Sequence, residues 1–227
     1  MKEDAEWKAI EELYEEAQSE IDADNDKIDE LLGWLDVFCD LECALKAFNS
    51  NMSSLFRAIS TEIQQEKQEG DFLSGTLLVG VVSAYEGFIQ SLFQLLCNNS
   101  NFMKMAIGNV RKLEEKDLNQ LRLSKNKQYS EKTLKDKIKK ATLHDPRQVS
   151  RLSLVFFHLK FPSLNQKDIE KILKQRNIFT HHGGISNGQQ EKITPRYILD
   201  ISNNINSLIN GYVKGIKKYS EQLELGK

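Results

Sequence analysis

Cysteine is scarce in this chain of 227 residues, and its three cysteines follow no pattern typical of a disulfide framework or a zinc site. Cys39, Cys43 and Cys97 are an odd number without a repeated CxxC spacing, and nothing at the N-terminus resembles a signal peptide. We therefore expect reduced thiols in a cytoplasmic protein. Cys39 and Cys43 fall on one helix face with no histidine nearby, which favours small core residues over zinc ligands.

Long hydrophobic runs and strand patterns are also missing. The most apolar stretch, residues 72–85, is interrupted by Ser and Gly and stops at Glu86, short of the roughly 20 residues that a membrane span requires. No alternating strand pattern competes with the helical periodicity over a comparable length. The sequence therefore predicts an all-α protein without a membrane-spanning segment, long enough for one compact unit with a real core.

The net charge of −2 hides a strong separation of charge along the chain. Residues 1–40 hold fifteen Asp or Glu and three Lys, a local balance of −12. Residues 104–160 hold fifteen Lys or Arg and six Asp or Glu, a local balance of +9. The basic region has the charge that a phosphate-binding surface needs, but a solvated helix face would have it as well.

Three amphipathic helices are predicted at the start of the chain. Apolar residues recur every three or four positions in residues 4–21, about 27–48 and 52–63. The polar sequences at 22–26 and 49–51 separate them and predict turns.

Residues 1–48 are expected to form an acidic helical extension packed on the bundle, and residues 49–227 to form the main helical domain. Because the extension is so acidic, it is a candidate to shield the basic region 104–160 or to contact a partner. Ordinary additional core helices are the simpler alternative.

The stretch from about 72 to 97 is apolar almost all round, which is typical of a helix enclosed by others. Gly80, Ala84 and Gly87 share one face, on which another helix could approach closely. Glu86 lies within this apolar surround and must find a hydrogen bond or a cation. It is either a structural anchor or part of a site.

Three further helices are predicted after an irregular region that ends near residue 145. Asp145-Pro146 marks the start of the first helix, Ser163 or Asn165 caps the second, and the third follows Pro195. Gly183-Gly184 supplies a C-terminal stop for the second helix.

The end of that second helix gathers residue types that suit RNA cleavage. Arg176, Asn177, His181 and His182 lie within seven residues. Arginine can bind a phosphate and stabilise charge on its transition state, and histidine can take a proton from a ribose 2′-hydroxyl or return one to the leaving oxygen. Such a reaction needs no metal or cofactor, and the Cys and His residues elsewhere have no metal-site spacing.

Two segments resemble the HEPN family (higher eukaryotes and prokaryotes nucleotide-binding). They are Arg176-Asn177-Ile178-Phe179-Thr180-His181 with the following Gly184-Ile185, and the upstream helix 77–89. The resemblance spans roughly residues 72–215. It implies an all-helical domain that dimerises with its R-x(4–6)-H motifs facing each other, forming a metal-independent endoribonuclease site from two protomers. Many family members act in toxin–antitoxin or antiviral defence systems, so RNA, a second copy and an antitoxin or defence protein are the implied partners.

The resemblance also implies roles for individual residues. Arg176 would stabilise the scissile phosphate, His181 would act as general base or acid, and Asn177 matches the polar residue that often follows the arginine. Glu86 would match an acidic residue that many members carry on an earlier helix. His182 has no fixed counterpart, and it either binds RNA or compensates the dipole at the helix end.

Two other classes of function remain open. One is a non-catalytic nucleotide-binding, RNA-binding or protein-interaction module, in which Arg176 and His181 bind a phosphate or hold the dimer without cleavage. The other is a helical structural or adaptor protein in which the motif is coincidental.

Overall fold

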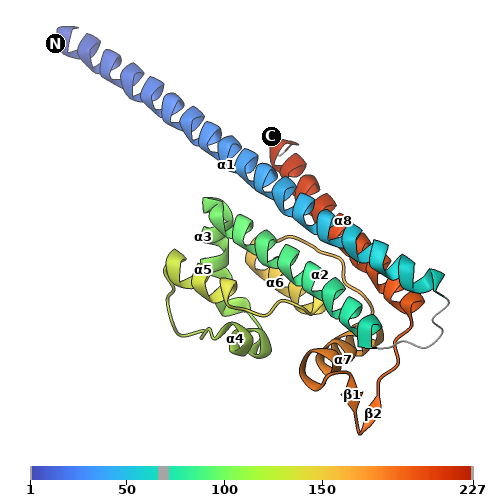
Figure 1. Ribbon diagram of the computed structural model, residues 1–227. Helices are drawn as coiled ribbons and strands as arrows, with labels where there is room; N and C mark the ends of the chain where they lie inside the picture. Colours follow the sequence, from blue (N-terminus) through green and yellow to red (C-terminus); the bar gives the residue numbers. More distant parts are fainter. Residues whose placement is uncertain (1, 66–71, 226–227) are drawn as a thin grey trace.

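The computed structural model describes residues 2–65 and 72–225, and these form an all-α protein (Figure 1). The described residues contain eight α-helices, one 3-10 turn and a two-stranded antiparallel hairpin. The elements are α1 (Lys2–Gln64), α2 (Phe72–Asn98), α3 (Ser100–Asn109), η1 (Val110–Lys112), α4 (Glu115–Leu121), α5 (Glu131–Lys139), α6 (Pro146–Phe157), α7 (Gln166–His182), β1 (Ile185–Ser186), β2 (Gln189–Gln190) and α8 (Pro195–Leu225). The predicted all-α class is confirmed.

The N-terminal region is one helix and not three. α1 runs without interruption for 63 residues, about 95 Å at 1.5 Å per residue. The turns predicted at 22–26 and 49–51 are therefore wrong. Neither segment contains Gly or Pro, and the Asp, Asn and Ser that suggested turns each cost a helix less than about 0.7 kcal/mol. At the second segment, burial of both Phe48 and Met52 favours continuing the helix.

The two halves of α1 have different surroundings. In the packed half, residues 34–64, one face lies against α2 and α8. In the free half, residues 7–33, the described side chains are almost all exposed, and the helix projects beyond the other elements (Figure 1). The expectation that residues 1–48 pack on the bundle is thus wrong for the free half. The free half also leaves the basic region of its own chain uncovered, so it does not shield that region in this structure.

α2 is the central helix, as its apolar sequence predicts. It contacts α1, α3, α5, α7 and α8, and fifteen of its 27 residues are buried. By length and composition alone α2 could cross a membrane, but 56% of its most apolar window is buried by the other helices. That burial is typical of the core helix of a soluble protein.

The cysteines differ from expectation. Cys39 and Cys43 are exposed, so the prediction that they are core residues is wrong. The buried face of α1 in this region runs through Trp34, Val37 and Leu41, and the two cysteines lie off it. Cys97 of α2 is buried, and this burial raises the pKa of its thiol to about 12.

Candidate active site at the contact of α2 and α7

α7 begins and ends where its sequence predicts. Asn165 is the N-cap, and its side-chain oxygen accepts a hydrogen bond of 3.0 Å from the Asp168 N–H. At the other end Gly183 adopts a left-handed conformation with φ of 58°, and the Gly184 N–H donates to the Ile178 carbonyl at 3.2 Å. The helix therefore stops directly after His182, and the two histidines occupy its last turn.

A glycine on α2 lets α7 approach closely. A Cβ at Gly75 would lie only 1.9 Å from Cε1 of Phe179, so the Phe179 ring occupies the space that any side chain at residue 75 would need. Phe179 is 6% exposed. This contact, which the sequence did not indicate, sets the distance between the two helices that carry Glu86 and Arg176.

Glu86 and Arg176 form an ion pair across this contact. Arg176 Nη2 lies 3.3 Å from Oε1 and 3.4 Å from Oε2 of Glu86, and Nη1 donates to Asn177 Oδ1 at 3.2 Å. The Arg176 side chain is 16% exposed and that of Glu86 is 23% exposed. Within the described residues, Arg176 Nε is buried without a hydrogen-bond partner. The guanidinium is thus held to Glu86 by Nη2 and to Asn177 by Nη1, and its other N–H groups are only partly used.

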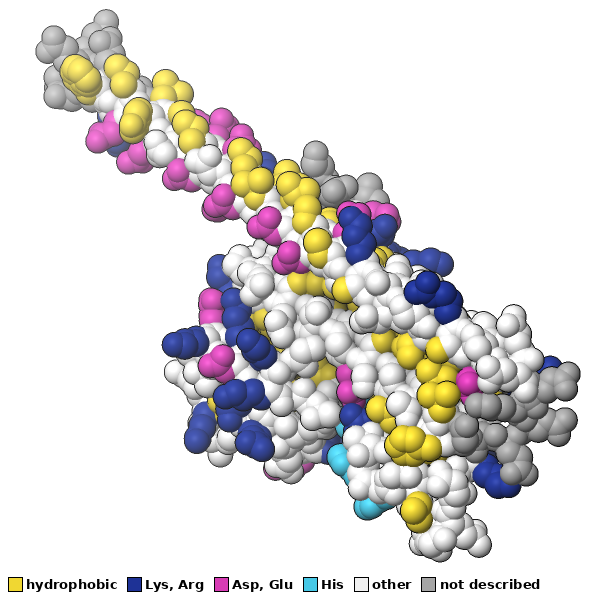
Figure 2. Space-filling view, viewed as in Figure 1, with side chains coloured by type: hydrophobic (Ala, Val, Ile, Leu, Met, Phe, Trp, Pro, Cys, Tyr) yellow, Lys and Arg dark blue, Asp and Glu magenta, His cyan; other side chains and the backbone are white. Residues whose placement is uncertain are grey.

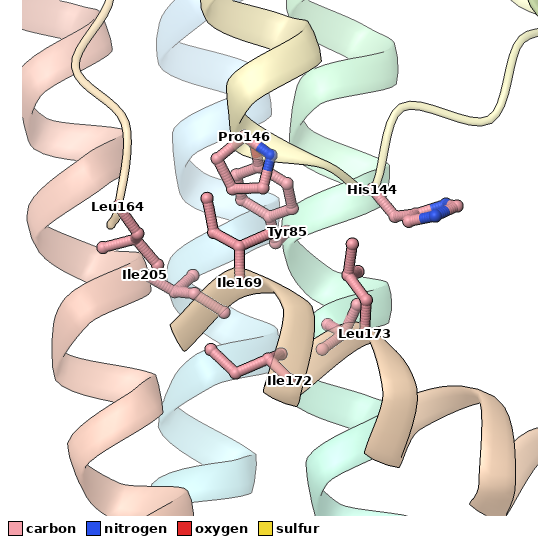
Figure 3. Close-up of a pocket in the computed structure, with 9 residues that line it drawn as sticks. Tyr85, His144, Pro146, Leu164, Ile169, Ile172, Leu173 and Ile205 are labelled. Atoms are coloured by element: carbon pink, nitrogen blue, oxygen red, sulfur yellow. The ribbon is translucent and has the colours of Figure 1, made fainter. Parts of the chain in front are cut away.

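His144 joins the pair from the loop before α6, and sequence reasoning missed it. Its Nδ1 lies 3.5 Å from Glu86 Oε1, and its side chain is 26% exposed. Figure 3 shows His144 at the edge of a cavity of about 20 Å³, which has room for roughly one water molecule, with its ring directed away from Leu164 and Ile205 on the far side. Glu86 therefore faces two cationic or potentially cationic side chains, one from α7 and one from this loop.

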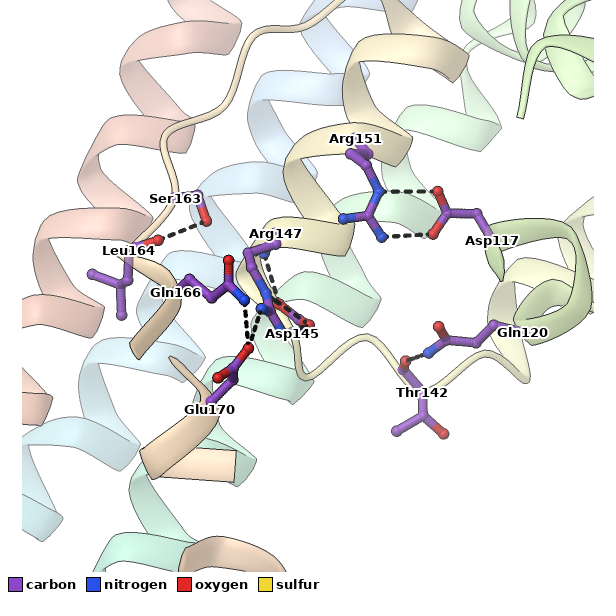
Figure 4. A network of polar contacts seen from close by, with 10 residues as sticks. All are labelled: Asp117, Gln120, Thr142, Asp145, Arg147, Arg151, Ser163, Leu164, Gln166 and Glu170. Atoms are coloured by element: carbon purple, nitrogen blue, oxygen red, sulfur yellow. Dashed lines mark hydrogen bonds and ion pairs between the residues drawn. The ribbon is translucent and has the colours of Figure 1, made fainter. Parts of the chain in front are cut away.

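A polar network fixes the loop of His144 relative to α7 (Figure 4). Asp145 caps α6 by accepting the Arg147 N–H at 2.9 Å, and its carboxylate binds the Arg147 guanidinium at 2.7 Å. Arg147 also binds Glu170 of α7 at 3.2 Å. Burial alone would raise the pKa of Asp145, but the hydrogen bonds and charge of Arg147 together lower it.

His181 and His182 lie apart from this cluster. Both are exposed in the last turn of α7, and in the described part of the chain neither takes part in a hydrogen bond or ion pair. Arg176 and His181 are five positions apart, which rotates them by about 140° around a helix of 3.6 residues per turn. The structure therefore brings Glu86, Arg176, Asn177 and His144 together and leaves His181 on a different face of α7.

Much of the basic region is free to meet an anion. Figure 2 shows Lys and Arg side chains gathered on the surface over α5, and Lys125, Lys127 and Lys132 are among those exposed. Arg147 and Arg151 are exceptions, because both are bound to carboxylates of this chain. The surface thus remains strongly basic after its internal ion pairs are formed.

Among the described residues no three His, Cys, Asp or Glu side chains are grouped so that they could hold a metal ion. No family model, curated protein or solved structure matches the chain. What the chain offers chemically is a guanidinium oriented by Glu86, two exposed imidazoles that lie apart from it in the last turn of α7, and a basic surface.

Proposed function

We propose that this protein is a metal-independent endoribonuclease of the HEPN type, of the kind found in toxin–antitoxin and antiviral defence systems. The observation that carries the proposal is the ion pair of 3.3 Å between Arg176 on α7 and Glu86 on α2. The motif arginine and the acidic residue expected on an earlier helix were singled out separately in the sequence, and they lie in contact. Glu86 then serves to orient the guanidinium toward a phosphate.

The proposed reaction is attack of the ribose 2′-oxygen on the adjacent phosphorus. His181 takes the proton of the 2′-hydroxyl as the bond from oxygen to phosphorus forms, and Arg176 stabilises the charge that develops on the phosphoryl oxygens. The bond from phosphorus to the 5′-oxygen breaks, and a protonated imidazole supplies the proton that this leaving group needs. The products are a 2′,3′-cyclic phosphate and a 5′-hydroxyl.

Two copies of the chain are needed to complete this site. His181 lies about 140° around α7 from Arg176, so one chain does not present both side chains to the same phosphate. A second copy facing α7 would supply a histidine opposite each arginine. Asn177, which is exposed and bound to Arg176, would lie at this contact.

The decisive experiment is incubation of the purified protein with total RNA in EDTA. We expect cleavage by the wild type, fragments that end in 2′,3′-cyclic phosphate, and a loss of at least about 100-fold in Arg176→Ala and in His181→Ala. Lys174→Ala and Thr180→Ala are matched controls, because both residues are exposed on α7 and neither has a role in the proposed chemistry. Cleavage that requires a metal ion, or that survives in both active-site variants, would contradict the mechanism.

Mixing the two inactive variants tests whether the site is shared. A heterodimer of Arg176→Ala and His181→Ala chains retains one arginine and one histidine on different protomers, so its activity should exceed that of either parent. If both variants still bind RNA and the wild type does not cleave it, the chain is a binding module instead. His144→Gln would separate the roles of the histidines, since we expect it to weaken the Glu86 cluster without removing a proton-transfer group.

A further inference from the structure

The free half of α1 carries a continuous apolar stripe that no other described part of the chain covers. Figure 2 shows it as a line of hydrophobic side chains along the projecting helix. The stripe extends just past the free half to Leu35, and nine of its large apolar side chains are between 53% and 72% exposed: Trp7, Ile10, Leu13, Tyr14, Ile21, Ile28, Leu31, Leu32 and Leu35. A stripe of this kind on a water-soluble helix indicates a surface that another molecule covers.

The spacing along the stripe is that of a coiled coil. Positions 7, 10, 14, 17, 21, 24, 28, 31, 35 and 38 alternate in steps of three and four, the pattern of heptad positions a and d. Asp24, at a d position, is the only charged residue among these ten. The repeat runs for more than four heptads, which exceeds what the amphipathic face of an ordinary helix in a small domain requires.

The area of the stripe is large enough for a stable interface. Nine large side chains that are each more than half exposed present on the order of 1,000 Å² per chain, above the roughly 800 Å² that each partner buries in an interface of standard size. The stripe is separate from the buried face of α1, because Leu35 is 58% exposed whereas the neighbouring Trp34 is buried in the core.

We propose that the stripe binds the same stripe of a second copy of this chain as a two-stranded coiled coil. Most carboxylates of the free half stand at outer heptad positions, where they face solvent in such a pair: Glu12, Glu15, Glu16, Asp22, Asp26, Asp29 and Glu30. The charged residues beside the stripe are only Glu11, Glu20 and Lys27. A strongly basic partner helix would find few carboxylates at these flanking positions, whereas a second copy meets little repulsion there.

Asp24 sets the orientation of the pair. In a parallel coiled coil each Asp24 would face the same residue of the other chain within the apolar seam, where two like charges are unfavourable. An antiparallel pair places a positions opposite d positions. In the register where Ile21 faces the partner's Asp24, Glu20 lies beside the partner's Lys27. The antiparallel arrangement therefore removes the repulsion and adds two symmetric ion pairs.

This contact is independent of the proposed nuclease site. An antiparallel pair of the free halves places the two helical bodies at opposite ends of the coiled coil, so it does not bring the two copies of α7 together. The two contacts use different surfaces of one chain and can be lost separately. RNA cleavage and self-association through α1 are therefore separate readouts.

Sedimentation equilibrium of the full chain tests the pairing. We expect the wild type to self-associate at micromolar concentrations, into dimers through α1 alone or into larger species if the proposed α7 contact forms as well. Ile28→Glu should weaken the association through α1 by roughly 100-fold or more, because a charge enters the seam on both chains. Ala23→Glu is the matched control, because it adds the same charge at an outer heptad position less than two helical turns from residue 28. In this variant the association through α1 should persist. A monomeric wild type at high micromolar concentration, an unaffected Ile28→Glu, or an equal loss in both variants would overturn the proposal.

Disulfide trapping tests the orientation in a Cys39→Ser, Cys43→Ser background. The proposed register places residue 17 opposite residue 28 of the other chain, so a chain with both Ala17→Cys and Ile28→Cys should oxidise to a covalent dimer. Either substitution alone should not. Cross-linking of Ile28→Cys alone would show a parallel pair, and failure of the double variant would exclude the register; either result would overturn the antiparallel assignment.

Discussion

Replacing Gly75 by alanine should separate α2 from α7 and destabilise the protein. The new Cβ would lie 1.9 Å from Cε1 and 2.0 Å from Cδ1 of Phe179, far inside any observed contact distance. The Phe179 ring cannot simply move away, because it is buried and also packs close to the backbone of Gly184. The clash must therefore be relieved by movement of the helices themselves.

The expected change in the free energy of unfolding of Gly75→Ala follows from two opposing effects. Alanine in place of glycine stabilises a helix by up to about 1 kcal/mol, whereas overpacking a well-packed core costs about 1–3 kcal/mol. The steric effect wins at Gly75, with a net loss of about 1–2 kcal/mol in the free energy of unfolding. Gly87→Ala is the matched control on the same helix, because a Cβ there meets nothing within 4 Å. It should stabilise the protein by up to about 1 kcal/mol.

Urea denaturation followed by circular dichroism measures both variants. The two should differ by about 1–3 kcal/mol with opposite signs relative to the wild type, and with similar dependence on urea. If Gly75→Ala is as stable as Gly87→Ala, the close packing of α7 on α2 is refuted, and with it the geometry of the Arg176–Glu86 pair.

Three further variants or reagents probe the core and the site's surroundings. Because burial raises the pKa of Cys97 to about 12, its thiol stays protonated at pH 8, and Ellman's reagent should titrate two thiols in the native protein and the third only after denaturation. Asp117→Asn should destabilise by about 2 kcal/mol in urea titrations, since Asp117 is 2% exposed and accepts hydrogen bonds of 2.9 and 3.1 Å from Arg151. Asp145→Asn should cost about 1 kcal/mol at pH 7. The pKa of Asp145 is lower in the folded protein, because Arg147 outweighs the effect of burial, so this contribution is present above about pH 4 and is lost as pH falls through the folded pKa. The stabilities of this variant and the wild type should converge in that range.

Sequence reasoning succeeded where a specific backbone chemistry marks a helix end. Asp145-Pro146 opens α6, Asn165 caps α7 and Gly183 ends it. The Asp145 and Asn165 side chains accept hydrogen bonds from free N–H groups at the helix start, and Gly183 adopts the left-handed conformation that ends α7. The turns expected within α1 failed because Asp, Asn and Ser permit a turn without enforcing one. Whether the chain turns there depends on what the flanking apolar residues pack against, and that is decided by distant helices.

The site was predictable in its residue types but not in its assembly. Glu86 was notable as a carboxylate in an apolar helix, and Arg176 as one of a group of residue types that suit RNA cleavage, yet their contact depends on the packing of Phe179 onto Gly75. His144 carried no signal, because its place beside Glu86 follows from the ion pairs that tie its loop to α7. A local pattern cannot encode contacts that depend on the relative position of three elements.

The division of α1 into a packed and a free half has a consequence for how this helix forms. Starting a helix is costly because several residues must be fixed for the first hydrogen bond, whereas each later residue adds one bond. In the packed half, the contacts with α2 and α8 offset the free-energy cost of starting the helix. The free half therefore only has to extend a helix that already exists. In a single chain the amides of the free half should exchange faster with each turn toward the N-terminus, while those of the packed half exchange only with global unfolding. The free half thus forms and melts as a helix–coil transition that is anchored at one end and separate from the cooperative core.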